Sequence, residues 1–187
     1  MRRAVPDDAA DIARIQVITW RTAYRTLLPA EVLDDWDDDA ATAAWRNAIT
    51  RPPTPGHRVL VAEESGTTVG FLAFGPAELG AGEQASTAGP TAEVAALLVE
   101  PRWGRRGHGS RLLAALADLA RADGLGDLVC WLPDADRVTA EFLSSAGWAR
   151  DGRARGLDTG TTTIRQVRWH TTLDDDPPET SDGRGAQ

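Results

Sequence analysis

Near the start of the chain, apolar residues recur at the three- to four-residue spacing that places side chains on one face of an α-helix. Ile12, Ile15 and Ile18 carry this repeat, which continues for about six more residues. Asp7 precedes it and is the expected N-cap, because its carboxylate can accept hydrogen bonds from the unpaired amides of the first turn. Residues 2–5 are expected to form a short strand ahead of this helix.

A second helical pattern and three strand patterns follow. The helical region is expected at 29–49, broken in two by an acidic run and ended by a proline-rich loop. Residues 58–63 and 67–75 are rich in β-forming residues and are joined by Glu-Ser-Gly-Thr, which predicts a β-hairpin. After a loop rich in small residues, the almost entirely apolar segment 92–101 is typical of a central strand buried on both faces.

The second half of the chain alternates between helix and strand patterns. A strand is expected at 124–133, a helix at 135–146 ended by Gly147, and a final antiparallel pair that includes 161–170. A further helix begins near Gly107, and its apolar stripe consists of Leu112, Leu113, Leu116, Leu119 and Ala120. The order β-α-α-β-β-β-α-β-α-β-β predicts a mixed α/β sheet with helices on both faces.

Composition limits the classes of function. The chain has 187 residues, of which 42% are apolar, so we expect one domain at 1–172 followed by a disordered acidic tail at 173–187. The formal net charge of −8 argues against a general nucleic-acid-binding protein, so any anion site must be local. The chain has no lysine, which excludes Schiff-base chemistry and a Walker-type phosphate loop.

Further features of the sequence favour a cytoplasmic protein without a membrane partner. The N-terminal residues lack the apolar segment of a signal peptide, and no apolar run approaches the ~20 residues that cross a bilayer. Cys130 is the single cysteine, so no internal disulfide forms, and its apolar strand indicates a core residue. His57 and His108 have no metal-ligand neighbours at usable spacing, so no metal is expected. A monomer or a homodimer fits the sequence equally well.

The stretch PRWGRRGHGS, residues 101–110, is a candidate anion site. The first amides of a helix have no internal partners and lie at the positive end of the helix dipole. Glycines let a ligand approach the backbone closely, and arginines suit phosphate. The alternative is a solvated loop with Ser110 as N-cap. The residues expected to form a pyrophosphate cradle are Gly104, Arg105, Arg106, Gly107, His108, Gly109 and Ser110, with added charge from Arg102.

This stretch resembles the acetyl-CoA motif of the GNAT N-acetyltransferase superfamily. That motif runs strand, Pro, an aromatic residue, Gln/Arg-x-x-Gly-x-Gly/Ala and helix, and Gly107 and Gly109 match its glycines. Gly104 stands in place of the leading Gln/Arg, and Arg105 stands in place of the glycine that usually follows. Because such a cradle works largely through backbone amides, the exchange is tolerable.

Two further segments strengthen the resemblance, which covers about residues 2–172. WLPDADRVTAEFLSSAGW, starting at Trp131, is similar to the family's Trp-Val-x-x-x-Asn-x-x-Ala-x-x-Phe-Tyr-x-x-x-Gly-Phe segment. Phe142 is kept in it and Asp136 replaces the asparagine. WRTAYRTLLP, residues 20–29, is similar to the family's Trp-Arg-x-x-Tyr-x-x-x-Leu-Pro segment.

The resemblance implies a mostly antiparallel central sheet of six or seven strands, flanked by helices on both faces and splayed between its two central strands. It implies acetyl-CoA as cosubstrate, with the pantetheine arm bound in the splay. Backbone groups of Leu97, Leu98 and Val99 would hold that arm, and Asp136 and Phe142 would complete the cofactor-binding set with the cradle.

The resemblance also implies roles beside the acceptor. Glu93 matches a frequent position for a carboxylate that removes the amine's proton through water. A solvated glutamate at the strand end is an equally good interpretation. Trp20 and Tyr24 would lie beside the acceptor, with core packing as the alternative. Asp34 to Asp39 form an acidic run that would attract a cationic amine or is simply a solvated charge run.

The group that protonates the leaving thiolate is left open. Leu143 stands where the family often has a tyrosine, and it has no proton to give. Ser144 or Ser145 acting through water is one alternative, and departure without an acid is another, since a thiol has a pKa of roughly 8.5.

The function expected from these residues is acetyl-CoA-dependent N-acetylation of a primary amine on a small molecule or a peptide, by direct attack. The alternative is a GNAT-fold protein that binds coenzyme A and catalyses little, acting as a sensor or a partner module.

Overall fold

The structure is a computed structural model. It describes residues 1–23, 25, 36–78, 80, 83, 86–160 and 162–173. Tyr24, part of the predicted second helical region and the predicted tail from residue 174 onward lie outside the described residues.

Seven strands of the described chain form one sheet in the order β1-β2-β3-β4-β5-β7-β6. Every neighbouring pair is antiparallel except β4 and β5, which are parallel. The predicted mixed, mostly antiparallel sheet is therefore confirmed. The strands are β1 (Arg2–Arg3), β2 (Arg58–Glu64), β3 (Thr67–Pro76), β4 (Thr91–Val99), β5 (Asp127–Pro133), β6 (Ala149–Asp158) and β7 (Thr163–Thr172).

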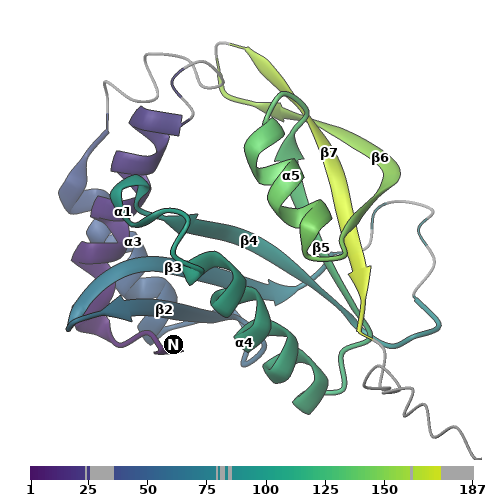
Figure 1. The fold of residues 1–187 in the computed structure, drawn as a ribbon, viewed down its shortest axis with the longest axis horizontal. Coiled ribbons are helices and arrows are strands. Elements are labelled where there is room, and N and C mark those ends of the chain that lie inside the picture. Colours follow the sequence, from purple (N-terminus) through teal and green to yellow (C-terminus); the bar gives the residue numbers. More distant parts are fainter. Residues whose placement is uncertain are drawn as a thin grey trace, which may run out of the picture.

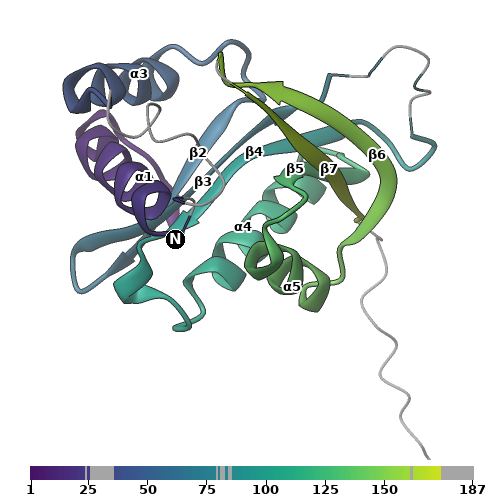
Figure 2. The ribbon, with the colours of Figure 1, turned by 90° about the horizontal axis from the view of Figure 1, so that it is seen from above.

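Helices cover both faces of this sheet, as the sequence predicts. Helices α1 and α3 lie against one face, and α4 and α5 lie against the other (Figure 2). None of the helices in the described part of the chain is long and apolar enough to cross a membrane. The helical segments are η1 (Pro6–Asp8), α1 (Ala9–Ala23), α3 (Asp38–Thr50), η2 (Pro101–Trp103), α4 (His108–Ala122) and α5 (Arg137–Ser145).

Each face has its own apolar core, because side chains along the strands alternate between the two faces. Under α1 and α3 the core is built on Ile12, Ile15, Val59, Val61 and Phe71. Under α4 and α5 it is larger and includes Leu60, Leu72, Leu112, Leu116, Leu128 and Trp148. The predicted stripe of α4 is confirmed, with Leu119 as its least buried large member.

The N-cap of the first helical segment is Val5, not the predicted Asp7. Asp8, not Asp7, accepts the hydrogen bond from the Val5 backbone N–H, at 2.7 Å. Asp8 also receives two hydrogen bonds from Arg2, at 2.7 and 2.8 Å, which lower the pKa of its carboxyl against the opposing effect of burial. Asp7 is exposed. The correct carboxylate is therefore the one that the β1 arginine can reach.

The predicted glycine stops and turns match the backbone geometry. Gly147 follows α5 with φ of 84°, the left-handed conformation expected of a residue that ends a helix. Ser65 and Gly66 both have positive φ in the β2–β3 turn, as the right-handed twist of a hairpin favours. Leu173 lies one residue past the expected domain boundary, yet it is buried and donates its N–H to the Gly126 carbonyl at 2.7 Å.

The two central strands separate after a short paired stretch (Figure 1). β4 and β5 pair only from Thr91 opposite Asp127 to Val94 opposite Cys130. Beyond that point β4 continues to Val99 without a partner on its β5 side within the described chain. Strand β4 therefore carries five residues whose backbone groups on that side are free, and the predicted splay is confirmed.

A β-bulge lies at the point of separation. Val94 opposes Phe74 and Ala96 opposes Ala73, so Ala95 is the extra residue on β4. The bulge reverses the alternation of faces: Val94 packs toward α4, whereas Ala96 packs toward α1. It thereby turns the free part of β4 relative to the paired part.

Candidate active site

A narrow cavity, here called the slot, lies between the separated strands β4 and β5. Its volume is about 320 Å³. The walls are mainly apolar and come mostly from β4, β5 and α5, with further residues from α1, α3, α4, β6 and β7. The strand and helix residues that line it include Ala96, Leu97, Leu98, Cys130, Trp131, Leu132, Thr139 and Leu143. Its shape and its free strand edge suit an extended, mostly apolar chain that carries amide groups.

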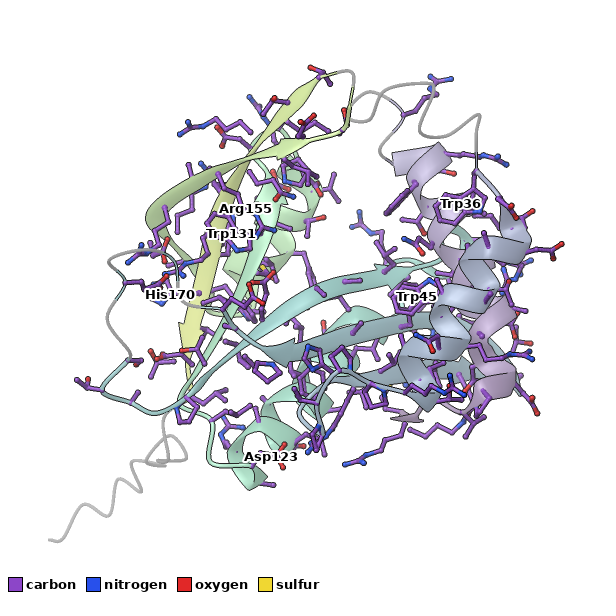
Figure 3. All side chains as sticks on the ribbon, turned by 180° about the vertical axis from the view of Figure 1, so that it is seen from behind. Trp36, Trp45, Asp123, Trp131, Arg155 and His170 are labelled. Atoms are coloured by element: carbon purple, nitrogen blue, oxygen red, sulfur yellow. The ribbon has the colours of Figure 1, made fainter. Side chains whose placement is uncertain are left out.

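A larger outer cavity of about 720 Å³ adjoins the slot. Ala95, Trp45 and Trp131 line both spaces, which therefore adjoin at these residues, here called the passage. Trp131 and Arg155 come from the β5–β7–β6 half of the sheet and Trp45 from α3 (Figure 3). The charged residues that line the outer cavity are Arg58, Glu78, Glu83, Glu93, Arg153, Arg155 and Arg168.

Glu93 lies on the floor of the outer cavity, two residues before the bulge. Its neighbours in the sheet are Gly75 on β3 and Val129 on β5. The side chain is about one quarter exposed, and its Oε1 lies 3.9 Å from a terminal nitrogen of Arg155. Glu93 is therefore a carboxylate at the passage between slot and cavity, within reach of solvent.

The cradle residues form a tight turn ahead of α4. Gly107 has φ of 78° and precedes the helix, and the Arg111 N–H donates to its carbonyl at 3.0 Å. An added Cβ at Gly107 would have no atom within 4 Å. Gly109 lies in the first turn, where an added Cβ would lie 3.2 Å from the ring of Phe142. Gly107 thus faces open space, whereas Gly109 is small because α5 packs against it.

Arg105 has φ of 61°, a left-handed conformation that costs a side-chain-bearing residue roughly 1–2 kcal/mol. A glycine adopts this left-handed backbone conformation without that cost. Arg105→Gly is therefore expected to raise the melting temperature by about 2 °C, since strain relief of 1–2 kcal/mol exceeds the added chain entropy of about 0.4–1 kcal/mol. Thermal unfolding measures this shift.

Ser65→Gly is the matched control for this prediction. Ser65 has φ of 51° and carries no charge, so its replacement should give a similar rise in melting temperature. A fall in melting temperature for Arg105→Gly alone would mean that the arginine side chain stabilises the turn by more than its backbone costs.

The His108 side chain points into the protein, away from the cradle. It is 2% exposed, and its Nε2 lies 2.6 Å from Oε2 of Glu64. Its Nδ1 lies 3.0 Å from a guanidinium nitrogen of Arg111. Because arginine can only donate, Nδ1 must accept, so the proton is on Nε2 and is donated to Glu64. Only the backbone of His108 is available to a ligand.

Glu64 ties the cradle to strand β2. Besides His108, it accepts a hydrogen bond from Arg106 at 3.0 Å. Desolvation opposes ionisation of this carboxyl, but the hydrogen bonds from His108 and Arg106 outweigh it and lower its pKa. The Arg106 guanidinium also lies over the Trp103 ring, 4.8 Å from its centroid. Arg106 is therefore already partly neutralised and held against the turn.

The Arg102 side chain is also paired within the protein. It forms an ion pair with the buried carboxylate of Glu100, which also binds Arg14 at 2.7 Å. Arg105 differs from both other arginines, since in the described part of the chain its guanidinium has no carboxylate partner. Of the three, Arg105 has the charge most available to a ligand.

Asp136 and Phe142 contribute to packing around the slot and do not line it. Asp136 is buried and caps α5, accepting a hydrogen bond from the Thr139 backbone N–H at 3.0 Å. Thr139, one turn into the helix, does line the slot. Of the predicted pantetheine contacts, Leu97 and Leu98 line the slot, whereas Val99 packs toward α4.

The two serines proposed as substitutes for the tyrosine do not line the slot. Leu143 is buried in its wall, as the resemblance implies for this position. Ser145 faces away and donates its hydroxyl to the Phe142 carbonyl at 2.7 Å, and Ser144 is exposed. Among the described lining residues, Thr139 is the one with a hydroxyl.

The aromatic residues of the helical side form one group. Trp20 lines the slot and meets Trp36 edge to face, with ring centroids 5.3 Å apart. Trp45 lies 5.0 Å from Phe71 and donates its Nε1–H to Gln16 at 2.7 Å. Trp20 lines the slot and not the outer cavity, so its place beside the acceptor stays a prediction, while Tyr24 lies outside the described residues.

The described part of the acidic run has a structural role. Asp37 is the N-cap of α3 and accepts a hydrogen bond from the Ala40 backbone N–H at 2.9 Å. Asp38 accepts one from Trp36 Nε1 at 3.0 Å. These carboxylates are exposed at the helix start, where the helix dipole favours negative charge.

Several lining residues were not predicted from the sequence, namely Trp45, Trp131, Thr139, Arg155 and Gln166. Gln166 and Arg155 are directly opposite in the β6–β7 ladder, and Trp131 is opposite Arg168 in the β5–β7 ladder. Alternation along 161–170 would have placed Gln166 and Arg168 on one face, but the strand partners that bring them to the cavity require the sheet order.

Cys130 lies in the slot wall but is not suited to nucleophilic chemistry. Burial, with a further contribution from the negative charge of Glu93, raises the pKa of its thiol to about 12. At pH 8 about one thiol in 10⁴ is then ionised, so iodoacetamide should label the folded protein about 10³-fold more slowly than a free thiol of pKa 8.5. Intact mass measurement follows the labelling.

Urea-unfolded protein is the control for this prediction, and it should label at the free-thiol rate. Labelling of the folded protein at that rate would mean that the Cys130 thiol reaches solvent as a thiolate.

The chain was compared with known proteins. It matches the sequence profile described as "Acetyltransferase (GNAT) family" over residues 14–148. The uncharacterized N-acetyltransferase YuaI of Bacillus subtilis (strain 168) is 27% identical over 133 residues, covering 71% of this chain and 70% of that protein.

Solved structures share the fold. PaiA N-acetyltransferase from Thermoplasma acidophilum, in complex with coenzyme A, has a TM-score of 0.70 at 15% identity, covering 91% of this chain and 96% of that one. The putative acetyltransferase yncA from Salmonella typhimurium, with acetyl-CoA, has a TM-score of 0.65 at 22% identity, covering 96% of both chains.

The profile spans most of the chain, including the second part of α1, the splayed strands, the cradle and α5. The overall fold agrees with that of the solved structures, with TM-scores of 0.70 and 0.65. The chain therefore belongs to the GNAT acetyltransferase family and is an acyltransferase with acetyl-CoA as cosubstrate.

Proposed function

We propose that this protein transfers the acetyl group of acetyl-CoA to a primary amine of a small molecule or a peptide, by direct attack of the amine. One observation supports this most strongly. The slot beside the free edge of β4 adjoins, at Ala95 and Trp131, the outer cavity that Glu93 lines. A thioester held in the slot and an amine held in the cavity would meet at that passage.

The residues present fit the cosubstrate. Backbone N–H groups of the cradle, with the charge of Arg105, suit a diphosphate, and Gly107 leaves open space for it. The free edge of β4 at Leu97 and Leu98 suits the amides of pantetheine as an added strand. When bound, acetyl-CoA supplies the acetyl group as a thioester.

Glu93 is the proposed base. It takes a proton from the acceptor ammonium, directly or through one water, and the neutral nitrogen then attacks the thioester carbonyl. A nitrogen–carbon bond forms, the carbon–sulfur bond breaks, coenzyme A leaves as the thiolate, and the second proton of the attacking nitrogen passes to water. A β4 backbone N–H beyond the bulge would stabilise the negative charge on the carbonyl oxygen.

Departure of the thiolate needs no strong acid in this proposal. The slot wall offers Leu143 where the family often has a tyrosine, and the Thr139 hydroxyl is too weak an acid to protonate a thiolate fully. It can still donate a hydrogen bond to it. The thiolate is a good leaving group by itself, because a thiol has a pKa of roughly 8.5.

The test combines calorimetric titration of acetyl-CoA with measurement of thiol release over a panel of amines. Binding together with thiol release on at least one amine supports the acetyltransferase. Binding without release on any amine would favour the sensor alternative, for which the apolar Leu143 is the motivating observation. Preference for ATP or NAD over coenzyme A would overturn both.

A further inference from the structure

Arg155 is held in the outer cavity in a fixed orientation. Its guanidinium lies over the Trp131 ring, 4.4 Å from the ring centroid. Its Nε donates a hydrogen bond to Oε1 of Gln166 at 2.8 Å, and Gln166 is itself buried. Figure 3 shows Arg155 and Trp131 together on the same half of the sheet. The side chain is thus preorganised at two points, its ring contact and its Nε.

The two terminal nitrogens of Arg155 remain available. To the side chains of the described residues they make no hydrogen bond, and the nearest carboxylate oxygen, that of Glu93, lies 3.9 Å away. The side chain is 45% exposed, toward the cavity that it lines. A guanidinium with Nε occupied and both terminal nitrogens free can bind a carboxylate in bidentate fashion.

Arg168, its neighbour in the same cavity, shows the contrast. Its side chain is 12% exposed and is saturated by Glu83 and Asp151, each at 2.6 Å. These hydrogen bonds, against the opposing effect of burial, raise its pKa further above its ordinary value. Arg168 therefore fixes the cavity wall, whereas Arg155 keeps its terminal nitrogens available to a ligand.

We propose that the acceptor is an amino acid whose carboxylate lies next to its amine, with Arg155 binding the carboxylate and Glu93 binding the ammonium. This inference rests on the proposed function and narrows its acceptor class. The opposite charges of Arg155 and Glu93 lie 3.9 Å apart, a spacing that suits the neighbouring ammonium and carboxylate of a zwitterion. The amine of a peptide N-terminus lacks an adjacent carboxylate, so peptides are disfavoured.

The cavity geometry agrees with this orientation. Glu93 and Ala95 lie on β4 at the passage to the slot, and Arg155 lies beyond them on β6. An amino acid with its carboxylate on Arg155 therefore has its nitrogen between the arginine and the passage. The ion pair orients the substrate, and the base is next to the atom that must lose a proton.

The experiment compares a panel of free amino acids with their carboxamides, using thiol release for kcat/KM. The amide keeps the amine and removes the negative charge. In the wild type, kcat/KM for at least one amino acid should exceed kcat/KM for its amide by at least about tenfold, because the amide cannot form the charge-assisted hydrogen bonds with Arg155. In Arg155→Gln the ratio of kcat/KM for the acid to kcat/KM for its amide should fall to about one.

Arg165→Gln is the matched control. It removes an arginine from the same ladder whose guanidinium pairs with Asp134 and does not line the cavity. It should keep the preference for the acid. Arg155→Lys keeps the positive charge but lacks the paired N–H donors of the guanidinium. It should therefore show a preference for the acid between those of the wild type and Arg155→Gln.

The outcomes separate the two proposals. Equal rates on acid and amide, or thiol release on peptides and simple amines alone, would overturn the amino-acid inference and leave the acetyltransferase intact. Acetyl-CoA binding without thiol release on any amine would overturn the proposed function. Calorimetry of the amino acids with coenzyme A present then gives a second readout. Binding that Arg155→Gln abolishes would still support the carboxylate site, and no binding would overturn it.

Discussion

Glu93→Gln is expected to lower kcat by about 10²-fold while the dissociation constant of acetyl-CoA stays within about twofold of the wild type. General bases contribute typically 10²–10⁴-fold, and glutamine keeps the shape of the side chain without its basicity. Acetyl-CoA affinity is unaffected because Glu93 lines the outer cavity and is not among the residues that line the slot. Steady-state thiol release and calorimetry measure the two quantities.

Glu141→Gln is the control for loss of one negative charge. Glu141 is exposed on α5, outside slot and cavity, and its substitution should leave kcat unchanged. Raising the pH offers a further check, since a substrate amine that loses its proton in solution no longer needs the base. Activity of Glu93→Gln should then approach that of the wild type as pH rises toward the pKa of the acceptor. A wild-type kcat for Glu93→Gln near neutral pH would remove Glu93 from the mechanism.

Local sequence patterns predicted the elements well because each element is determined mainly by its own residues. The stripe of α4 and the hairpin around Ser65 and Gly66 follow from spacing and turn chemistry, and both are confirmed. Gly147 ends α5 for the same local reason. Asp7 is not the N-cap because the helical segment already begins at Pro6, after Val5. The carboxylate that stabilises this start is that of Asp8, which Arg2 of the neighbouring strand also binds.

The sequence predicted only those parts of the candidate site that depend on backbone conformation, such as the turn of the cradle. The need for glycine-like conformations around Gly107 is visible in the sequence, and the left-handed Arg105 follows the family's glycine position. The inward side chain of His108 was not predictable, because its partner Glu64 is 44 residues away. The splay itself came from the resemblance, since the bulge at Ala95 has no signature in an apolar run.

Arg155 is a second residue whose place in the site could not be predicted from the local sequence pattern. It lies in a polar, exposed strand whose pattern gives no sign of a cavity. Its significance comes from three neighbours on three other strands, namely Gln166, Trp131 and Glu93. Sequence reasoning places residues on faces of elements, and only the order β4-β5-β7-β6 brings these faces together.

The cradle is tested most directly by a pair of glycine substitutions at the two ends of α4. Gly107 and Gly124 have φ of 78° and 71°, and an added Cβ would meet no atom within 4 Å at either position. Each change to alanine should therefore cost about 1 kcal/mol in folding free energy and lower the melting temperature by about 2–4 °C. Only Gly107→Ala should raise the dissociation constant of acetyl-CoA, by about tenfold or more.

The difference between the two variants isolates the ligand's contribution. Gly124 follows the last turn of α4, far from the helix start, so its variant reports the effect of strain alone. At Gly107 the added methyl group enters the open space beside the first helical amides and keeps a diphosphate from approaching them. Equal acetyl-CoA affinity in both variants, measured by calorimetry at a temperature where both are folded, would mean that the diphosphate is not held at this turn.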